Sequence, residues 1–149
     1  APLGIEAAVT NTATVSGTGI TPVTAAETVN AEAAPNLAIT KSVSPVPVTE
    51  NGTLTYTFRI QNYGSVAATN TTGVVITDTF APVLNNLTAA LNGTAWTAAT
   101  DYTYNEATGT FSSTAGAITV PAATYTQDST TGAWVVTPGE STLVITGTV

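Results

Sequence analysis

The feature that most constrains this chain is a two-residue alternation of apolar and polar side chains that recurs along its length. It is clearest at residues 53–62, where Leu54, Tyr56, Phe58 and Ile60 alternate with Thr, Arg and Gln. Successive side chains of a strand point to opposite faces of a sheet, so this pattern predicts a strand with one buried face. No segment shows convincing helical periodicity. The alternation therefore predicts an all-β fold.

Further strands are predicted between turns that contain Gly, Pro and Asn. They are expected at residues 7–15, 22–29, 36–44, 68–80, 87–91, 94–97, 102–104, 110–112, 118–120, 123–126, 133–136 and 141–149. Two Asn-Gly pairs, at residues 51–52 and 92–93, are strong signals for tight turns. Strands at about ten-residue spacing with frequent turns are typical of an antiparallel β-sandwich of immunoglobulin-like type.

Charge and composition exclude several functional classes. The chain has 149 residues and a net charge of −7, and Lys41 and Arg59 are its two cations. Two cations are too few to neutralise a run of phosphates or to bind an anionic membrane surface, so neither nucleic acid nor membrane is an expected partner. The chain contains no apolar run of about 18 residues, so no membrane-spanning segment is predicted. Trypsin-like proteases cut after Lys and Arg, so this chain has few cleavage sites, which suits a protein exposed outside the cell.

The residue types that carry catalysis and metal binding are mostly absent. The chain has no Cys and no His, which removes thiol chemistry, disulfides and the usual zinc and transition-metal ligands. Asp101, Glu106 and Asp128 are too scattered for a calcium loop. Trp96 and Trp134 are interpreted as core anchors rather than platforms for sugars. We therefore expect no enzymatic activity, no metal and no cofactor.

Several segments resemble, in order, the repeat domain called DUF11, which occurs in tandem in bacterial and archaeal surface proteins. The segments NLAITKSVSP, GTLTYTFRIQNYGS and TNTTGVVITDTF resemble its start, and DYTYNEATGTF, ITVPAAT and PGESTLVITGTV its middle and end. The resemblance covers about residues 35–149. It implies one extracellular, structural domain of the immunoglobulin-like type, without enzymatic activity.

The resemblance extends to the N-terminus in a changed order. The segments VTNTATVSG and TPVTAAETV resemble the last strands of such a repeat, but here they precede it. Residues 1–34 are therefore predicted to be a donor arm with strands at residues 7–15 and 22–29. A sandwich without its closing strands has an open edge that another strand can pair with.

We expect the arm to enter a neighbouring copy by β-augmentation. Val9, Asn11, Ala13 and Val15 share one face of the first strand and are the predicted interface residues. A head-to-tail contact of this kind does not close, so it predicts a filament made of copies of this chain. Two alternatives stay open: the arm closes its own domain, or the sequence is a piece of a longer tandem protein.

The predicted function is therefore that of a structural subunit of an extracellular, pilus-like filament. The alternative is a DUF11-like stalk or adhesin module that presents the loops around residues 82–115 to a ligand, or a component of a surface layer.

Three polar residues lie in otherwise apolar rows: Lys41, Asp78 and Asn11. Burial of a lysine favours its neutral amine, which is a nucleophile, while Asn11 offers an amide carbon and Asp78 an acid. The trio resembles the self-forming Lys–Asn isopeptide sites of Gram-positive surface domains, which implies an autocatalytic bond. The competing interpretation is an ordinary ion pair, or a Lys41 that snorkels to the edge. Asn62 is a rival amide, but its place before a Tyr-Gly turn predicts a cap.

Overall fold

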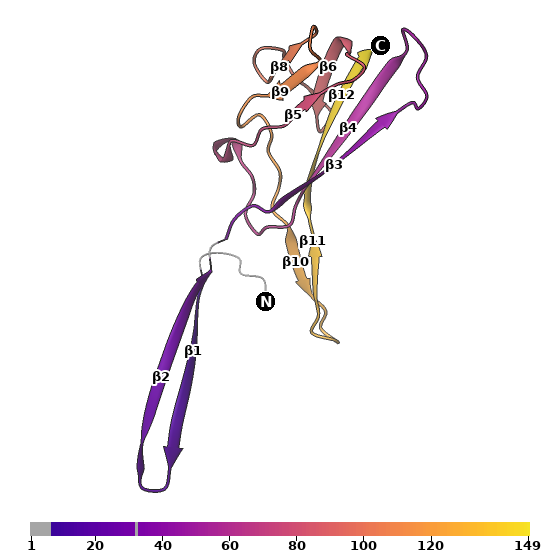
Figure 1. Cartoon of the computed structure of the whole chain (residues 1–149). Helices are drawn as coiled ribbons and strands as arrows, with labels where there is room; N and C mark the ends of the chain where they lie inside the picture. The colour runs from indigo at the N-terminus through magenta and orange to yellow at the C-terminus, as the bar shows by residue number, and fades with distance from the viewer. Residues whose placement is uncertain (1–6, 32) are drawn as a thin grey trace.

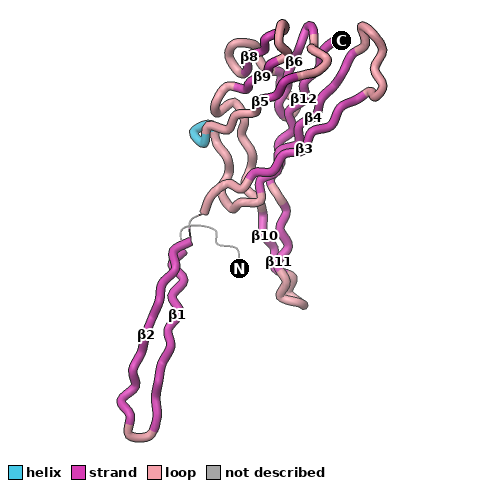
Figure 2. Tube along the Cα trace, viewed as in Figure 1, coloured by secondary structure: helices cyan, strands magenta, loops and turns pink. Residues whose placement is uncertain are grey.

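The computed structural model describes residues 7–31 and 33–149 and confirms an all-β fold with antiparallel sheets (Figures 1 and 2). Among these residues the regular elements are one 3₁₀ turn, η1, and twelve strands. They are β1 (Ala7–Gly17), β2 (Ile20–Ala31), β3 (Leu37–Ser44), β4 (Thr53–Asn62), η1 (Asn70–Thr72), β5 (Thr77–Thr79), β6 (Asn85–Leu91), β7 (Thr94–Ala95), β8 (Tyr102–Asn105), β9 (Thr110–Ser113), β10 (Thr124–Gln127), β11 (Trp134–Thr137) and β12 (Gly139–Thr148).

Residues 33–149 form the body of the subunit, and one layer of the body is a five-stranded antiparallel sheet in the order β3-β4-β12-β6-β7. In the register of β4 and β12, Phe58 lies opposite Leu143 and Tyr56 opposite Ile145. All four side chains are buried. The intervening residues of both strands face the other side of the sheet, as the pleat requires. The alternation in the sequence therefore decides which face of this sheet carries the core.

The second layer is a three-stranded sheet in the order β5-β9-β8. Aromatic rings fill the space between the layers. The Phe80 ring lies 4.7 Å from the Tyr56 ring and 6.2 Å from the Phe111 ring, measured between centroids. The Tyr102 ring stacks on Phe111 at 5.3 Å. Large rings bury much apolar surface in tilted or stacked contacts, so this cluster holds β4 against the second sheet.

The predicted single strand over residues 68–80 is wrong. The Thr69 amide donates to the Thr72 hydroxyl at 2.9 Å around η1. Gly73 then adopts a left-handed conformation with φ 71°, so that β5 spans Thr77–Thr79 alone. Threonine hydroxyls that bond nearby backbone compete with strand formation, and an alternation pattern does not reveal that competition.

The predicted strand over residues 118–120 is also wrong, because it is reduced to an isolated bridge between Ala68 and Val120. The amide of each of these two residues donates to the carbonyl of the other at 2.9 Å. The strand predicted at residues 53–62 is confirmed as β4, and the remaining predicted strands are present with shifted boundaries.

The N-terminal strands β1 and β2 pair in a long hairpin that extends away from the body (Figure 1). The register places Val9 opposite Val29, Ala13 opposite Ala25, and Asn11 opposite Glu27. These residues alternate with a threonine-rich face, on which the Thr10 and Thr28 hydroxyls bond at 2.8 Å. Every side chain of residues 8–30 is exposed. The hairpin therefore has an apolar face that nothing in the described chain covers.

Gly139, the first residue of β12, is required by a close backbone approach. A Cβ at this position would lie 1.9 Å from the Pro121 carbonyl oxygen and 2.8 Å from that of Ala122. We expect Gly139→Ala to lower the free energy of unfolding by about 3 kcal/mol, because backbone atoms must shift to relieve the overlap. Chemical denaturation measures the loss. Gly17→Ala is the control, since its Cβ would meet a flexible Ile20 side chain at 3.2 Å; equal losses for both variants would contradict the prediction.

Candidate functional site

The core-facing row of β3 is uncovered, although it continues the same sheet face as the buried row of β4. In register, Ile39 lies opposite Ile60 and Val43 opposite Tyr56. Ile60 and Tyr56 are 2% and 7% exposed, whereas Ile39 and Val43 are 52% and 38% exposed. The open row of β3 is defined as the four residues that share this face. They are Leu37, Ile39, Lys41 and Val43.

An apolar groove of about 180 Å³, called the edge groove, runs beside this row. It is lined by residues of β3, of β4 and of the segment before β5: Leu37, Ala38, Ile39, Ile60, Val74, Val75 and Ile76. Among the described strands β3 pairs with β4 alone, so its outer edge has no strand partner. Unpaired edge groups beside an apolar groove are what an incoming strand needs.

Lys41 and Asp78, two of the residues singled out in the sequence, form an ion pair beside the edge groove. Their side chains are 41% and 19% exposed. The Lys41 ammonium also lies over three aromatic rings, at 4.8 Å from the centroid of Tyr56, 5.3 Å from Phe80 and 5.6 Å from Phe58. Aromatic faces attract a cation, and the carboxylate supplies a charged partner, so both contacts hold the Lys41 side chain at this edge.

The third residue of the predicted trio, Asn11, lies on the separate hairpin opposite Glu27. A covalent bond between Lys41 and Asn11 therefore needs an Asn11 from another copy. The rival amide, Asn62, is fully buried and caps the turn as predicted. Its Oδ1 accepts from the Asn36 and Gly64 amides, both at 2.9 Å, and its Nδ2 donates to two carbonyl oxygens.

The isopeptide bond stays a prediction that a mass measurement decides. In the bond-forming step, the neutral Lys41 amine attacks the Asn11 side-chain carbonyl carbon, and the side-chain nitrogen leaves as ammonia. The mass per subunit then falls by about 17 Da in the assembled material. We expect an unchanged mass for the isolated subunit, because Lys41 is paired with Asp78 there. Assembled material of unchanged mass would rule the bond out.

Glu27 was not identified from the sequence as part of the candidate site. Its signal was present, since Glu27 shares one face of the second strand with Val23, Ala25 and Val29 and is the polar member of that row. The hairpin register was the missing information, because the turn at residues 18 and 19 and a register shift between Val15 and Gly17 together bring Glu27 opposite Asn11.

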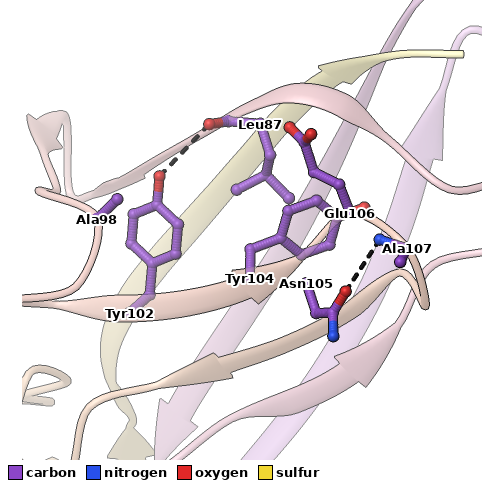
Figure 3. Close-up of a pocket in the computed structure, with 7 residues that line it drawn as sticks. All are labelled: Leu87, Ala98, Tyr102, Tyr104, Asn105, Glu106 and Ala107. Carbon is purple, nitrogen blue, oxygen red and sulfur yellow. Dashed lines mark hydrogen bonds between the residues drawn. The ribbon is translucent and has the colours of Figure 1, made fainter.

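A second hollow, of about 650 Å³, lies between β6 and β8 (Figure 3). It is lined by Leu87, Ala98, Tyr102, Tyr104, Asn105, Glu106 and Ala107. The tyrosine hydroxyls are bound to backbone: that of Tyr104 bonds the Leu84 amide and carbonyl at 2.9 Å, and that of Tyr102 donates to the Leu87 carbonyl at 3.4 Å. Burial raises the pKa of Tyr102 above its usual range. These tyrosines therefore support the loop structure.

The two tryptophans differ from each other. Trp96 packs against the core and stacks on Tyr102 at 6.4 Å, which confirms it as an anchor. Trp134 is 44% exposed on β11, so the prediction of a core anchor is wrong there. It lies on the β10–β11 hairpin, which projects from the body (Figure 2) and pairs with no other strand among the described residues.

Two of the three acids considered for metal binding support turns. Asp101 accepts from the Thr97 amide at 2.7 Å, and Asp128 from the Thr130 and Thr131 amides at 2.8 Å. These backbone donors hold the pKa of Asp128 below its usual range. Among the described residues, no group of three His, Cys, Asp or Glu side chains is placed to hold a metal ion. In the same part of the chain, no helix has the length and apolarity needed to cross a membrane.

In comparisons with known proteins, the chain matches no family model, no curated protein and no solved structure. The resemblance to DUF11 therefore stays a prediction, and the function is inferred from the geometry of the hairpin and the edge groove.

Proposed function

We propose that this chain is the structural subunit of an extracellular, pilus-like filament that polymerises when the β1–β2 hairpin of one copy enters the edge groove of the next. The observation that carries the proposal is a complementary pair of uncovered faces. The hairpin has an apolar face with its valines 53–68% exposed, and β3 has an apolar row that is 36–52% exposed at Leu37, Ile39 and Val43.

Edge pairing makes the two apolar rows neighbours on one sheet face, so each covers part of the other's exposed surface. An isolated two-stranded hairpin is marginal in water, because it has no layer on which to bury its apolar side chains. Completing the burial of a half-exposed valine or leucine contributes roughly 1 kcal/mol. Edge pairing along β3 adds backbone hydrogen bonds that the free subunit leaves to water.

The two faces lie on different parts of the subunit, so each copy can donate to one neighbour and accept from another. A heterologous contact of this kind propagates into a chain of subunits. The partner is therefore another copy of this chain, and the proposal assigns no catalytic activity, metal or cofactor. Extracellular localisation remains part of the proposal. The composition supports it, because a total of two Lys and Arg residues gives trypsin-like proteases few cleavage sites.

Ala25 and Ala26 offer a matched test, because they are neighbours in β2 that point to opposite faces of the hairpin. Ala25 lies opposite Ala13 in the apolar row, and Ala26 lies opposite Thr12 on the threonine face. We expect Ala25→Glu to abolish filament formation, since it would place an unpaired carboxylate in the edge groove. Ala26→Glu should still assemble. Electron microscopy and sedimentation measure the outcome, and equal assembly of both variants would contradict the proposal.

The alternative function, a stalk or adhesin module or a surface-layer component, is favoured by one observation. The hollow of Figure 3 lies within the loops around residues 82–115 and combines two tyrosines with the carboxylate of Glu106. This alternative has β1 and β2 closing their own domain, whereas in the structure they form a hairpin that extends away from the body (Figure 1). A loss of ligand binding in Glu106→Ala, with assembly state unaffected by removal of residues 1–34, would support it.

A further inference from the structure

We propose a specific register for the contact between copies. The Asn11–Glu27 pair of one hairpin lies level with Lys41 of the next subunit, and the hairpin tip points toward the start of β3. This inference rests on the proposed function, and it names which side chains meet.

The two rows of side chains share one pattern. From its start, the open row of β3 has an apolar residue at the first, second and fourth positions and Lys41 at the third. Going from the hairpin tip toward its base, the levels are Val15 with Val23, Ala13 with Ala25, Asn11 with Glu27, and Val9 with Val29. The polar level is again the third. The match holds whichever hairpin strand adjoins β3, because Asn11 and Glu27 lie opposite each other.

Charge favours the same register. The other cation, Arg59, bonds Glu140 at 2.7 Å, and that contact raises the pKa of Arg59 and lowers the pKa of Glu140. Arg59 and its β12 neighbour Thr142 lie between the core-facing residues of their strands, on the far face of the sheet. Lys41 is therefore the cation beside the edge groove, where Asp78 supplies its carboxylate.

An arriving hairpin excludes water from the Lys41–Asp78 pair. Charges removed from water need further polar partners, because their mutual attraction alone does not offset the loss of hydration. In the proposed register Glu27 supplies a carboxylate for the ammonium, and the Asn11 amide supplies a donor for Asp78 and an acceptor for Lys41. A shift of two residues would instead bring Ala13 and Ala25 to the level of Lys41.

The direction of the strands fixes which way the hairpin enters. β1 runs away from the body toward the hairpin tip, whereas β3 runs away from the hairpin (Figure 1). A hairpin whose tip points toward the start of the next subunit's β3 keeps the two subunits in the same orientation along the long axis. The opposite direction inverts the neighbour, which favours a closed pair over a filament.

Cysteine pairs test both level and direction, because the chain has no Cys of its own. The supporting variants combine Ile39→Cys with Ala13→Cys or with Ala25→Cys. The controls combine Ile39→Cys with Val15→Cys or Val23→Cys, a shift of two residues, or with Val9→Cys or Val29→Cys, the reversed direction. Paired residues on adjacent strands have Cα atoms about 5 Å apart, within disulfide reach, and a two-residue shift adds about 7 Å along the strand. All these positions lie in exposed strands, so the body should fold in each variant.

Full-length variants are assembled, oxidised and run on a denaturing gel without reductant. We expect the monomer band to be lost to a ladder of covalent oligomers for one of the two Ala variants, and to persist for all of the controls. A ladder in a control instead of the Ala variants would overturn the register while leaving hairpin donation intact. An intramolecular disulfide, or no filaments in any variant and in the unmodified chain, would overturn the proposed function and the register together.

Discussion

Removing residues 1–34 is expected to abolish filament formation and leave a folded monomer. The expectation follows from where the N-terminal hairpin buries its surface: every side chain of residues 8–30 is exposed in the single chain. Deleting residues 8–30, which are exposed along their whole length, removes no core contact. The apolar core between the two sheets should therefore keep its stability. Electron microscopy and analytical ultracentrifugation of the truncated chain measure assembly.

The truncated chain should also act as a chain terminator. It keeps the edge groove and lacks a hairpin to donate, so it can accept one full-length subunit and then offers nothing to the next. Added in increasing amounts to full-length subunits, it should shorten the filaments progressively. Thermal unfolding of the truncated chain is the control for folding. Filaments of normal length from the truncated chain alone would contradict donation by the hairpin, and unaltered lengths in the mixture would contradict the edge groove as its acceptor.

Replacement of Asn62 by alanine is expected to destabilise the body even more than Gly139→Ala. The Asn62 side chain is 0% exposed and satisfies four backbone groups. Its carbonyl oxygen accepts from the Asn36 and Gly64 amides, and its amide nitrogen donates to the Val66 carbonyl at 2.8 Å and the Pro121 carbonyl at 3.0 Å. Leaving buried backbone groups without partners costs about 1–3 kcal/mol each, with partial recovery from water, so we expect a loss of about 4 kcal/mol.

Chemical denaturation of Asn62→Ala measures this loss. Gln61→Ala is the matched control one residue earlier, since the partners of its side chain, the Tyr63 hydroxyl at 3.2 Å and the Glu140 carboxylate, are exposed to water. That change should stay within about 0.5 kcal/mol. Asn62 also fixes Asn36 immediately before β3, so the Asn62 variant should assemble less well. Equal losses in the two variants would show that the buried hydrogen bonds contribute little.

Much of the strand content was predictable because the physical cause is local. Along β4 the alternation of Leu54, Tyr56, Phe58 and Ile60 with polar residues predicts both the strand and its buried face, and the structure bears out both. Alternation misled at residues 68–80. There, threonine hydroxyls and the left-handed Gly73 interrupt a run whose composition favours a strand.

The candidate site was predictable only in part. The two-residue alternation alone placed Lys41 and Asp78 on the inward faces of their strands, and the structure brings them together as an ion pair. The same alternation placed Asn11 in an apolar row, yet Asn11 lies opposite Glu27 on a hairpin that extends away from the body (Figure 1). Which residues meet across two layers or two strands depends on register and loop paths, and these are long-range properties.

Three properties follow from the amino-acid sequence without any structure: an all-β chain, the apolar and polar faces of its main strands, and a scarcity of charge, with two Lys and Arg residues in total. The uncovered row of β3, beside the buried row of β4, emerges only from the packing of the folded subunit. The physical reason is that alternation sets which way each side chain points. The position of the second sheet decides whether anything covers that side chain.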